Sequence, residues 1–185
     1  MSLFRLTSAA VFSALLSLGS AAASPWDTWT TYDTIYQRGN WVLDINNYSD
    51  GTIACESRTT NNSDYWFKIL TISTGDYVIQ FENDGWDFGD QDQSQPFVVE
   101  IDRRGPWNIP GFKQGKAIFV KVTPPSDGLS RFFNEVARGN TLYLRNDRGN
   151  EIARFSLRGT SATLNQHRAC ERRIFSGFRS NDPFN

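Results

Sequence analysis

The stretch from residue 82 to residue 93, ENDGWDFGDQDQ, gathers aspartates around one tryptophan and could bind calcium. A calcium loop of the EF type needs oxygen ligands at its positions 1, 3 and 5, Gly at position 6 and Glu at position 12. A loop that starts at Asp90 lacks both the Gly and the Glu, and one that starts at Asp84 places Trp86 where an oxygen ligand belongs. We therefore predict an acidic turn, opened by Asn83-Asp84-Gly85, with an irregular calcium site as the alternative.

Paired carboxylates are the second kind of candidate catalytic group, because two carboxylates about 5 to 10 Å apart can catalyse hydrolysis of a glycosidic bond. Glu100 and Asp102 alternate along a predicted strand and are the formal candidates, although such residues are also typical of a solvent-facing strand surface. His167 is the only histidine, which excludes a multi-histidine zinc site. Ser161 does not lie in a Gly-x-Ser-x-Gly motif. We assign no catalytic residue and expect neither a cofactor nor a metal ion.

Tryptophans beside strands and turns suggest binding instead of catalysis. An exposed indole ring can stack on a sugar face while nearby carboxylates accept hydrogen bonds from its hydroxyl groups. The candidate ligand-binding residues are Trp66, Asp84, Trp86, Asp87 and Trp107. The alternative is that these rings belong to the core, since large aromatic residues dominate burial in β domains.

The elements that position these residues are predicted to be antiparallel strands, because apolar residues alternate with polar ones between regularly spaced turns. Three hairpins are expected, at residues 41–46 with 52–58, 66–72 with 77–82, and 141–145 with 151–157. Further strands are expected at 97–102, near Trp107 and at 116–122.

Two helices follow from apolar residues at helical spacing. The first covers residues 129–138, is capped by Ser126 or Asp127 and ends at Gly139. The second covers residues 162 to about 173. The predicted fold class is mainly β: an antiparallel β-sandwich or partly open barrel with two short helices packed on it, forming one domain over residues 24–185.

The first 23 residues combine Arg5, an apolar run and a small-residue end, the pattern of a removable secretory signal peptide. No later stretch is long and apolar enough for a transmembrane segment, so we expect none after signal removal. Cys55 and Cys170 are the only cysteines. In an oxidising compartment such a pair indicates one disulfide, and it would fasten the last helix to an early strand. The expected location is periplasmic or secreted.

Charge is nearly balanced overall, with 19 Lys and Arg against 20 Asp and Glu, but arginines dominate the last quarter of the chain. A basic face for an anionic partner is one interpretation. The other is that the acidic and basic parts pair on a solvated surface, and we expect no nucleic-acid partner.

The segment 132–166 combines a helix ending at Gly139, a hairpin, and Ser156-Leu157-Arg158-Gly159 running into an alanine-containing helix. In these features it resembles the C-terminal half of the invasion-associated locus B family. The resemblance implies an exported, periplasmic or surface-associated proteobacterial protein of β-rich fold, some of whose relatives are linked to host-cell invasion. It implies no active site. The chain has only two cysteines, whereas those relatives often have more.

These features favour a non-enzymatic, virulence-associated protein of the bacterial envelope that binds an envelope protein, a host protein or a glycan. The first alternative is a cell-wall glycan hydrolase that uses paired carboxylates. The second is an accessory subunit or inhibitor of a periplasmic machine.

Overall fold

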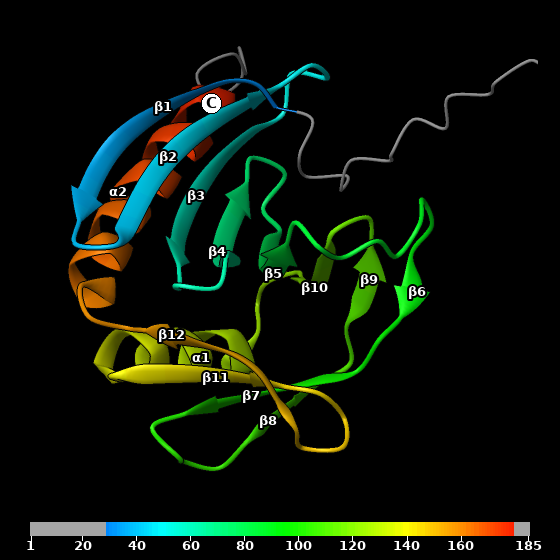
Figure 1. Ribbon diagram of the computed structural model, residues 1–185. Helices are drawn as coiled ribbons and strands as arrows, with labels where there is room; N and C mark the ends of the chain where they lie inside the picture. Colours follow the sequence, from blue (N-terminus) through cyan, green and yellow to red (C-terminus); the bar gives the residue numbers. More distant parts are fainter. Residues whose placement is uncertain (1–28, 180–185) are drawn as a thin grey trace, which may run out of the picture.

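The computed structural model describes residues 29–179, so the predicted signal peptide at residues 1–23 lies outside the described part. Within it the chain forms two antiparallel sheets and two helices (Figure 1). The larger sheet contains β1 (Trp29–Arg38), β2 (Trp41–Tyr48), β3 (Ile53–Thr60), β4 (Tyr65–Ile72), β5 (Tyr77–Asn83), β6 (Gln93–Ser94), β9 (Phe112–Gln114) and β10 (Ala117–Val122). The smaller sheet contains β7 (Phe97–Ile101), β8 (Trp107–Ile109), β11 (Thr141–Arg145) and β12 (Glu151–Ser156). The helices are α1 (Asp127–Arg138) and α2 (Thr160–Arg179).

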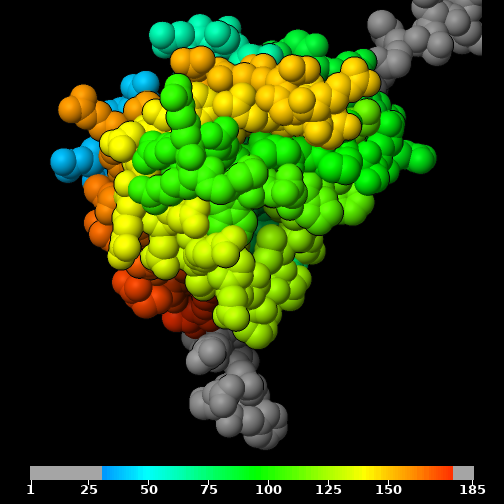
Figure 2. All heavy atoms as spheres, turned by 90° about the horizontal axis from the view of Figure 1, so that it is seen from below, coloured from blue at the N-terminus to red at the C-terminus, as the bar shows by residue number. Residues whose placement is uncertain are grey.

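The eight strands of the large sheet are ordered β1-β2-β3-β4-β5-β10-β9-β6, and the four of the small sheet are ordered β12-β11-β7-β8. Figure 1 shows the large sheet curving from β1 round to β6, with α2 along β1 to β3 and the small sheet below. Seen from below, the small sheet and α1 form a continuous surface over that end of the molecule (Figure 2). The predicted β-sandwich with two packed helices is confirmed.

The main core lies between one face of the large sheet, the small sheet and the helices. Phe67 and Phe81 come from neighbouring strands of the large sheet and stack with ring centroids 5.1 Å apart. Phe155 from the small sheet lies 5.8 Å from each of them. Trp41 contacts Phe67 edge-on at 5.7 Å. All four rings are almost completely buried. Alternate residues of a strand point to the same side, and these residues point to the side that faces the core.

The three predicted hairpins are confirmed, as β2–β3, β4–β5 and β11–β12. Helix α1 ends at Gly139 as predicted but begins at Asp127, two residues earlier than predicted. Of the two predicted caps it is Ser126 that serves, because its hydroxyl accepts a hydrogen bond from the Leu129 amide at 3.2 Å. Strands β1, β6 and β9 were not predicted from the pattern of residues.

Helix α2 is longer than predicted at both ends. Cys170 therefore lies in the interior of the helix, and not in the last turn where a helix ending near residue 173 would place it. Ile174, four residues later, packs with Cys170 and Leu43, and this apolar contact on the sheet continues the helix beyond the predicted end at residue 173.

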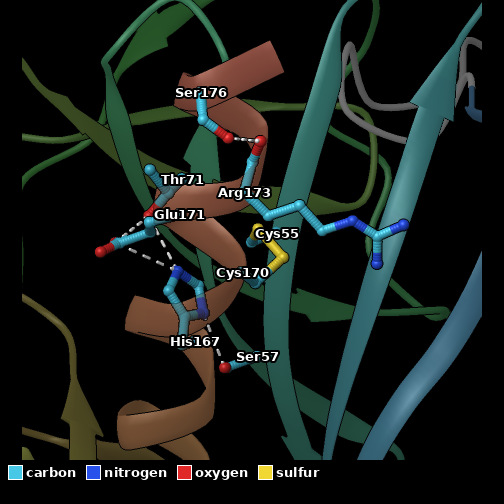
Figure 3. The surroundings of a disulfide bond; sticks show 8 residues. All are labelled: Cys55, Ser57, Thr71, His167, Cys170, Glu171, Arg173 and Ser176. Carbon is cyan, nitrogen blue, oxygen red and sulfur yellow. Dashed lines mark hydrogen bonds and ion pairs between the residues drawn. A yellow bond between two sulfur atoms is a disulfide. The ribbon is translucent and has the colours of Figure 1, made fainter.

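The predicted disulfide between Cys55 and Cys170 is confirmed and joins α2 to β3, with Cα atoms 6.0 Å apart (Figure 3). Across residues 29–179, neither helix combines the length and the apolar character needed to span a bilayer.

Candidate functional site

The register of the large sheet divides its side chains between two faces, since residues directly opposite each other in an antiparallel pair point the same way. Cys55 and Ser57 point towards α2, where they meet Cys170 and His167. Their neighbours along β3 must point away from α2. The second face therefore carries a series of polar residues, paired as Thr34 with Asp44, Asp44 with Glu56, Arg58 with Lys68, Lys68 with Gln80, and Trp66 with Glu82.

These residues surround a hollow of about 260 Å³ that we call the polar cleft. Its lining residues are Tyr32, Asp44, Asn46, Glu56, Arg58, Trp66, Lys68 and Glu82. Each comes from one of the five consecutive strands β1 to β5. The pairing of neighbouring strands places these side chains next to each other on one face of the sheet.

One end of the polar cleft holds two buried carboxylates that share a cation. Asp44 is only 2 % exposed and Glu56 only 4 %, and a buried charge is costly unless it is paired. The Arg58 Nε lies 2.7 Å from Asp44 Oδ2 and 3.6 Å from Glu56 Oε1. Thr34 donates to Asp44 at 2.6 Å, and Asn46 donates to Glu56 at 2.8 Å. Every carboxylate oxygen at this end thus has a partner.

The other end of the cleft is organised around Lys68. Its Nζ lies 2.5 Å from Glu82 Oε2, and the Gln80 amide nitrogen donates to the other oxygen of Glu82. Gln80 is fully buried, and its own amide oxygen accepts no hydrogen bond within residues 29–179. The Lys68 charge also acts on Glu56, so Lys68 interacts with the carboxylates at both ends of the cleft.

The pKa of the buried Glu56 carboxyl is shifted. Its burial raises the pKa of the carboxyl above the ordinary value, and the Asp44 charge adds to this effect. The Lys68 and Arg58 charges act in the opposite direction but do not cancel the effect of burial.

Two aromatic rings complete the cleft. Trp66 is half-buried, and the Arg58 guanidinium lies 5.3 Å from the centre of its ring. Tyr32 at the rim is 50 % exposed. The polar cleft thus combines hydrogen-bond donors, carboxylate acceptors and aromatic surface within one hollow, a combination that suits a small polar ligand.

The structure does not bring the five predicted ligand-binding residues together. Only Trp66 lines the polar cleft. Trp86 packs edge-on against Tyr65 at 5.5 Å, close to the acidic stretch. Trp107 belongs to the small sheet, where its Nε1 donates to Glu135 of α1 at 2.9 Å.

The acidic stretch begins as a turn, as predicted, since the Trp86 amide donates to the Asn83 carbonyl at 3.0 Å. Asp84 is 80 % exposed and lies 2.9 Å from the Lys116 ammonium. Asp87 is exposed and accepts from the Gly89 amide at 3.2 Å. No group of three or more His, Cys, Asp or Glu side chains in residues 29–179 is arranged to hold a metal ion.

Glu100 and Asp102 have structural partners instead of facing each other across a cleft. Glu100 pairs with Arg145 at 2.9 Å. Asp102 lies beyond the end of β7 with φ of 50°, and its carboxylate accepts from the Asn140 and Thr141 amides. Although burial by itself would raise the pKa of Asp102, these two amides hold it below its usual range.

His167 makes a hydrogen-bonded network with β3 and β4 (Figure 3). Its Nδ1 lies 2.8 Å from the Ser57 hydroxyl and its Nε2 lies 2.8 Å from the Thr71 hydroxyl. Thr71 also donates to Glu171 at 2.7 Å. Ser57 has no exposed surface and His167 only 2 %, so this serine–histidine pair is closed to a substrate and ties α2 to the sheet.

The polar cleft was missed at the level of sequence, apart from Trp66. Part of its signal is present in the predicted hairpins, because Asp44 alternates with the apolar residues Leu43 and Ile45 of its strand. The signal is weaker in β4 and β5, where Lys68 and Glu82 share a face with the buried residues Leu70 and Val78. Such positions are ordinarily solvent-facing, and their burial depends on the neighbouring strands.

Comparison with known proteins supplies no relative: no family model, curated protein or solved structure matches the chain.

Proposed function

We propose that this protein is an exported, non-enzymatic protein of the bacterial envelope that binds a glycan in the polar cleft. The observation that carries the proposal is the row of cross-strand polar residues beside Trp66 and Tyr32. A sugar hydroxyl both donates and accepts hydrogen bonds. The carboxylates of the cleft accept, whereas Arg58, Lys68 and Asn46 donate, so each kind of group has its complement.

The charge and size of the cleft indicate what class of glycan fits. Three carboxylates face two cations, so the charges of the cleft nearly balance. A neutral polyhydroxyl ligand is therefore better matched than a strongly charged one. The cleft volume of about 260 Å³ is slightly below the roughly 300–1,000 Å³ that is usual for sites of small organic ligands. It therefore favours one sugar unit of a chain whose remainder lies outside.

Two observations support export to the periplasm or beyond. The chain has a disulfide between Cys55 and Cys170, and such bonds form and persist mainly in oxidising compartments. The first 23 residues have the pattern of a secretory signal. The resemblance to the invasion-associated locus B family is the basis for the proposal that the protein serves in virulence.

A glycan array probed with the chain from residue 24 onward, followed by calorimetry on the best ligand, tests the proposal. We expect Trp66→Ala to weaken binding at least about fivefold, the effect of losing about 1 kcal/mol from a central aromatic contact. Trp86→Ala is the matched control, because Trp86 is also half-buried but lies outside the cleft, and its affinity should equal that of the wild type. An array without binders, or equal effects of the two substitutions, would show that the cleft is not a glycan site.

A glycan hydrolase remains the second candidate because of one specific observation in the same cleft. Asp44 and Glu56 are directly opposite each other in β2 and β3, which places their Cβ atoms about 4.5–5.5 Å apart. Retaining glycosidases have carboxyl groups about 5–5.5 Å apart, a separation that side chains on directly opposite residues can reach. A raised pKa, as Glu56 has, suits a general acid. If this candidate is correct, peptidoglycan fragments are cleaved by the wild type, and Glu56→Gln abolishes turnover while binding persists.

A further inference from the structure

A second hollow, of about 490 Å³, lies between the two helices. The start of α1, the middle of α2 and Tyr77 at the start of β5 line it. We call it the helix groove. It is separate from the polar cleft, because α2 and the polar cleft are on opposite faces of the large sheet. Its volume is within the roughly 300–1,000 Å³ that is usual for sites of small organic ligands.

The floor of the helix groove is apolar. Leu129 of α1 and Leu164 of α2 are buried there, and Phe133 is half-buried. The Phe133 ring lies 5.6 Å from the ring of Tyr77 in an edge-on arrangement. An apolar side chain of a ligand would cover these surfaces and remove them from water.

The charge of the groove comes from three residues. His167 also lines it, but both of its ring nitrogens are engaged by Ser57 and Thr71. Burial and the Arg168 charge lower the pKa of His167 to about 3, so the imidazole is neutral. What remains are Asp127 at the start of α1, and Arg168 and Glu171 on α2.

Arg168 and Glu171 are placed to take opposite charges of one ligand. Residues three apart on a helix are neighbours, with Cβ atoms about 5–6 Å apart. Glu171 is held on the Tyr77 side of the groove by the hydrogen bond from Thr71. Arg168 is exposed and makes no ion pair or hydrogen bond within residues 29–179. A ligand bearing only negative charge would meet Asp127 and Glu171, and one bearing only positive charge would leave Arg168 unmatched.

We propose that the helix groove binds a small zwitterion with an apolar side chain, of the α-amino-acid class. The carboxylate of the ligand pairs with Arg168, its ammonium group pairs with Glu171, and its side chain covers Leu129, Leu164 and Phe133. The inference does not depend on the proposed glycan site, which uses other residues on the other face of the sheet.

Phenylalanine and two analogues that each lack one charge, phenylethylamine and 3-phenylpropionate, test this proposal. Each is titrated at millimolar concentration into the protein with intact disulfide, by calorimetry and by two-dimensional amide spectra. Phenylalanine is expected to shift resonances of Phe133 and Leu164 and to bind about tenfold more tightly than either analogue, since one charge-assisted hydrogen bond is lost in each. Equal affinity of all three, or no shift at these residues, overturns the proposal.

Two substitutions on α2, Arg168→Gln and Arg173→Gln, test the role of Arg168 in phenylalanine binding. Arg168→Gln should weaken phenylalanine binding about tenfold and remove the preference for phenylalanine over phenylethylamine. Arg173→Gln changes the charge of α2 equally, but the Arg173 side chain extends away from Glu171 (Figure 3), so it should leave binding unchanged. Trp66→Ala should also leave it unchanged. If Arg168→Gln and Arg173→Gln behave alike, the assignment of Arg168 is wrong.

Discussion

His167 is the residue through which acid acts most directly on the fold. Burial holds its pKa at about 3 in the folded chain, whereas an unfolded chain binds the proton below about pH 6.5. The folded state thus binds fewer protons between these values, so the stability is complete above about pH 6.5 and falls as the pH drops towards 3. One such proton amounts to at most about 1.4 kcal/mol per pH unit.

We therefore predict that urea unfolding at about pH 4.5 gives a lower free energy of unfolding than at about pH 7, and that His167→Gln shows a smaller difference. The variant retains Glu171, Arg168 and all other titrating groups around the helix, so it isolates the imidazole. If wild type and variant lose the same free energy between the two pH values, His167 is not the group responsible.

The two carboxylates that pair with Arg58, Asp44 and Glu56, should differ in their effect on stability. Asp44 has the closer contact with Arg58, 2.7 Å against 3.6 Å for Glu56. Asp44→Asn leaves the half-buried guanidinium poorly paired and is expected to cost about 1–3 kcal/mol in urea unfolding at neutral pH. Glu56→Gln removes a charge whose burial is unfavourable, as its raised pKa indicates, and should cost less than about 1 kcal/mol. The reverse order would mean that Glu56 is the principal partner of Arg58.

At the residue scale, the sequence alone identifies a pair of residues when no other partner is possible. Cys55 and Cys170 could be paired because the chain has no other cysteine. Asp44 and Glu56 could not be assigned to a buried site, because their exposure depends on Arg58, Trp66 and Tyr32 from three strands. Polar residues at the solvent phase of a strand look alike in sequence whether or not neighbouring side chains cover them.

Because Gly139 has no Cβ atom, the end of α1 can approach β7 and the chain after β12 closely. A Cβ atom built at Gly139 would lie 2.6 Å from Ile101 Cγ2 and 2.8 Å from Leu157 Cδ1, both buried. Gly139→Ala should therefore overpack the core and cost about 1–3 kcal/mol. Gly105→Ala is the control, because no atom lies within 4 Å of its added Cβ, and its effect should stay within about 0.5 kcal/mol. Equal thermal unfolding of the two variants would show that the helix end moves to admit the methyl group.

The elements that were predictable are those whose signal is local. The turns between β2 and β3 and between β4 and β5 contain Gly51 and Gly75 at positive φ, and the alternation on either side fixes the hairpins. Strand β1 lacks this signal because it forms an edge of the sheet. Residues 31–35 of β1 are all exposed, so apolar and polar positions are not separated by burial. The extension of α2 beyond residue 173 also depends on a partner, the Leu43 cluster of the sheet.

At the scale of the whole molecule, the small sheet depends on contacts that no local turn specifies. Strand β7 pairs with β11, and the register places Ile101 opposite Leu142 and Val99 opposite Leu144. Helix α1 and strands β8, β9 and β10 lie between these two strands along the chain. The sequence pattern predicted the strands of the small sheet but not their order. Strands that are distant along the chain pair only because the core they share offsets the entropy cost of closing the long loop between them.

The disulfide fastens the last helix to the third strand of this assembly, and its contribution should be large. Cys55 and Cys170 are 115 residues apart. Opening such a link adds freedom mainly to the unfolded chain, and we predict a loss of about 2–5 kcal/mol in urea unfolding. The comparison is between oxidised and reduced wild-type protein, because both states retain the two sulfur atoms and the packing around them.

The position of the disulfide indicates which part of the reduced protein should open first. Helix α2 is held by the disulfide, by the apolar contact of Ile174 with Leu43, and by the His167 hydrogen bonds to Ser57 and Thr71. On reduction, hydrogen exchange should accelerate in the half of α2 that follows Cys170, while β11 and β12, which pair with each other, stay protected. Uniform acceleration across both regions would mean that the disulfide stabilises the domain only as a whole. Unchanged exchange in α2 would mean that the noncovalent contacts suffice to hold the helix on the sheet.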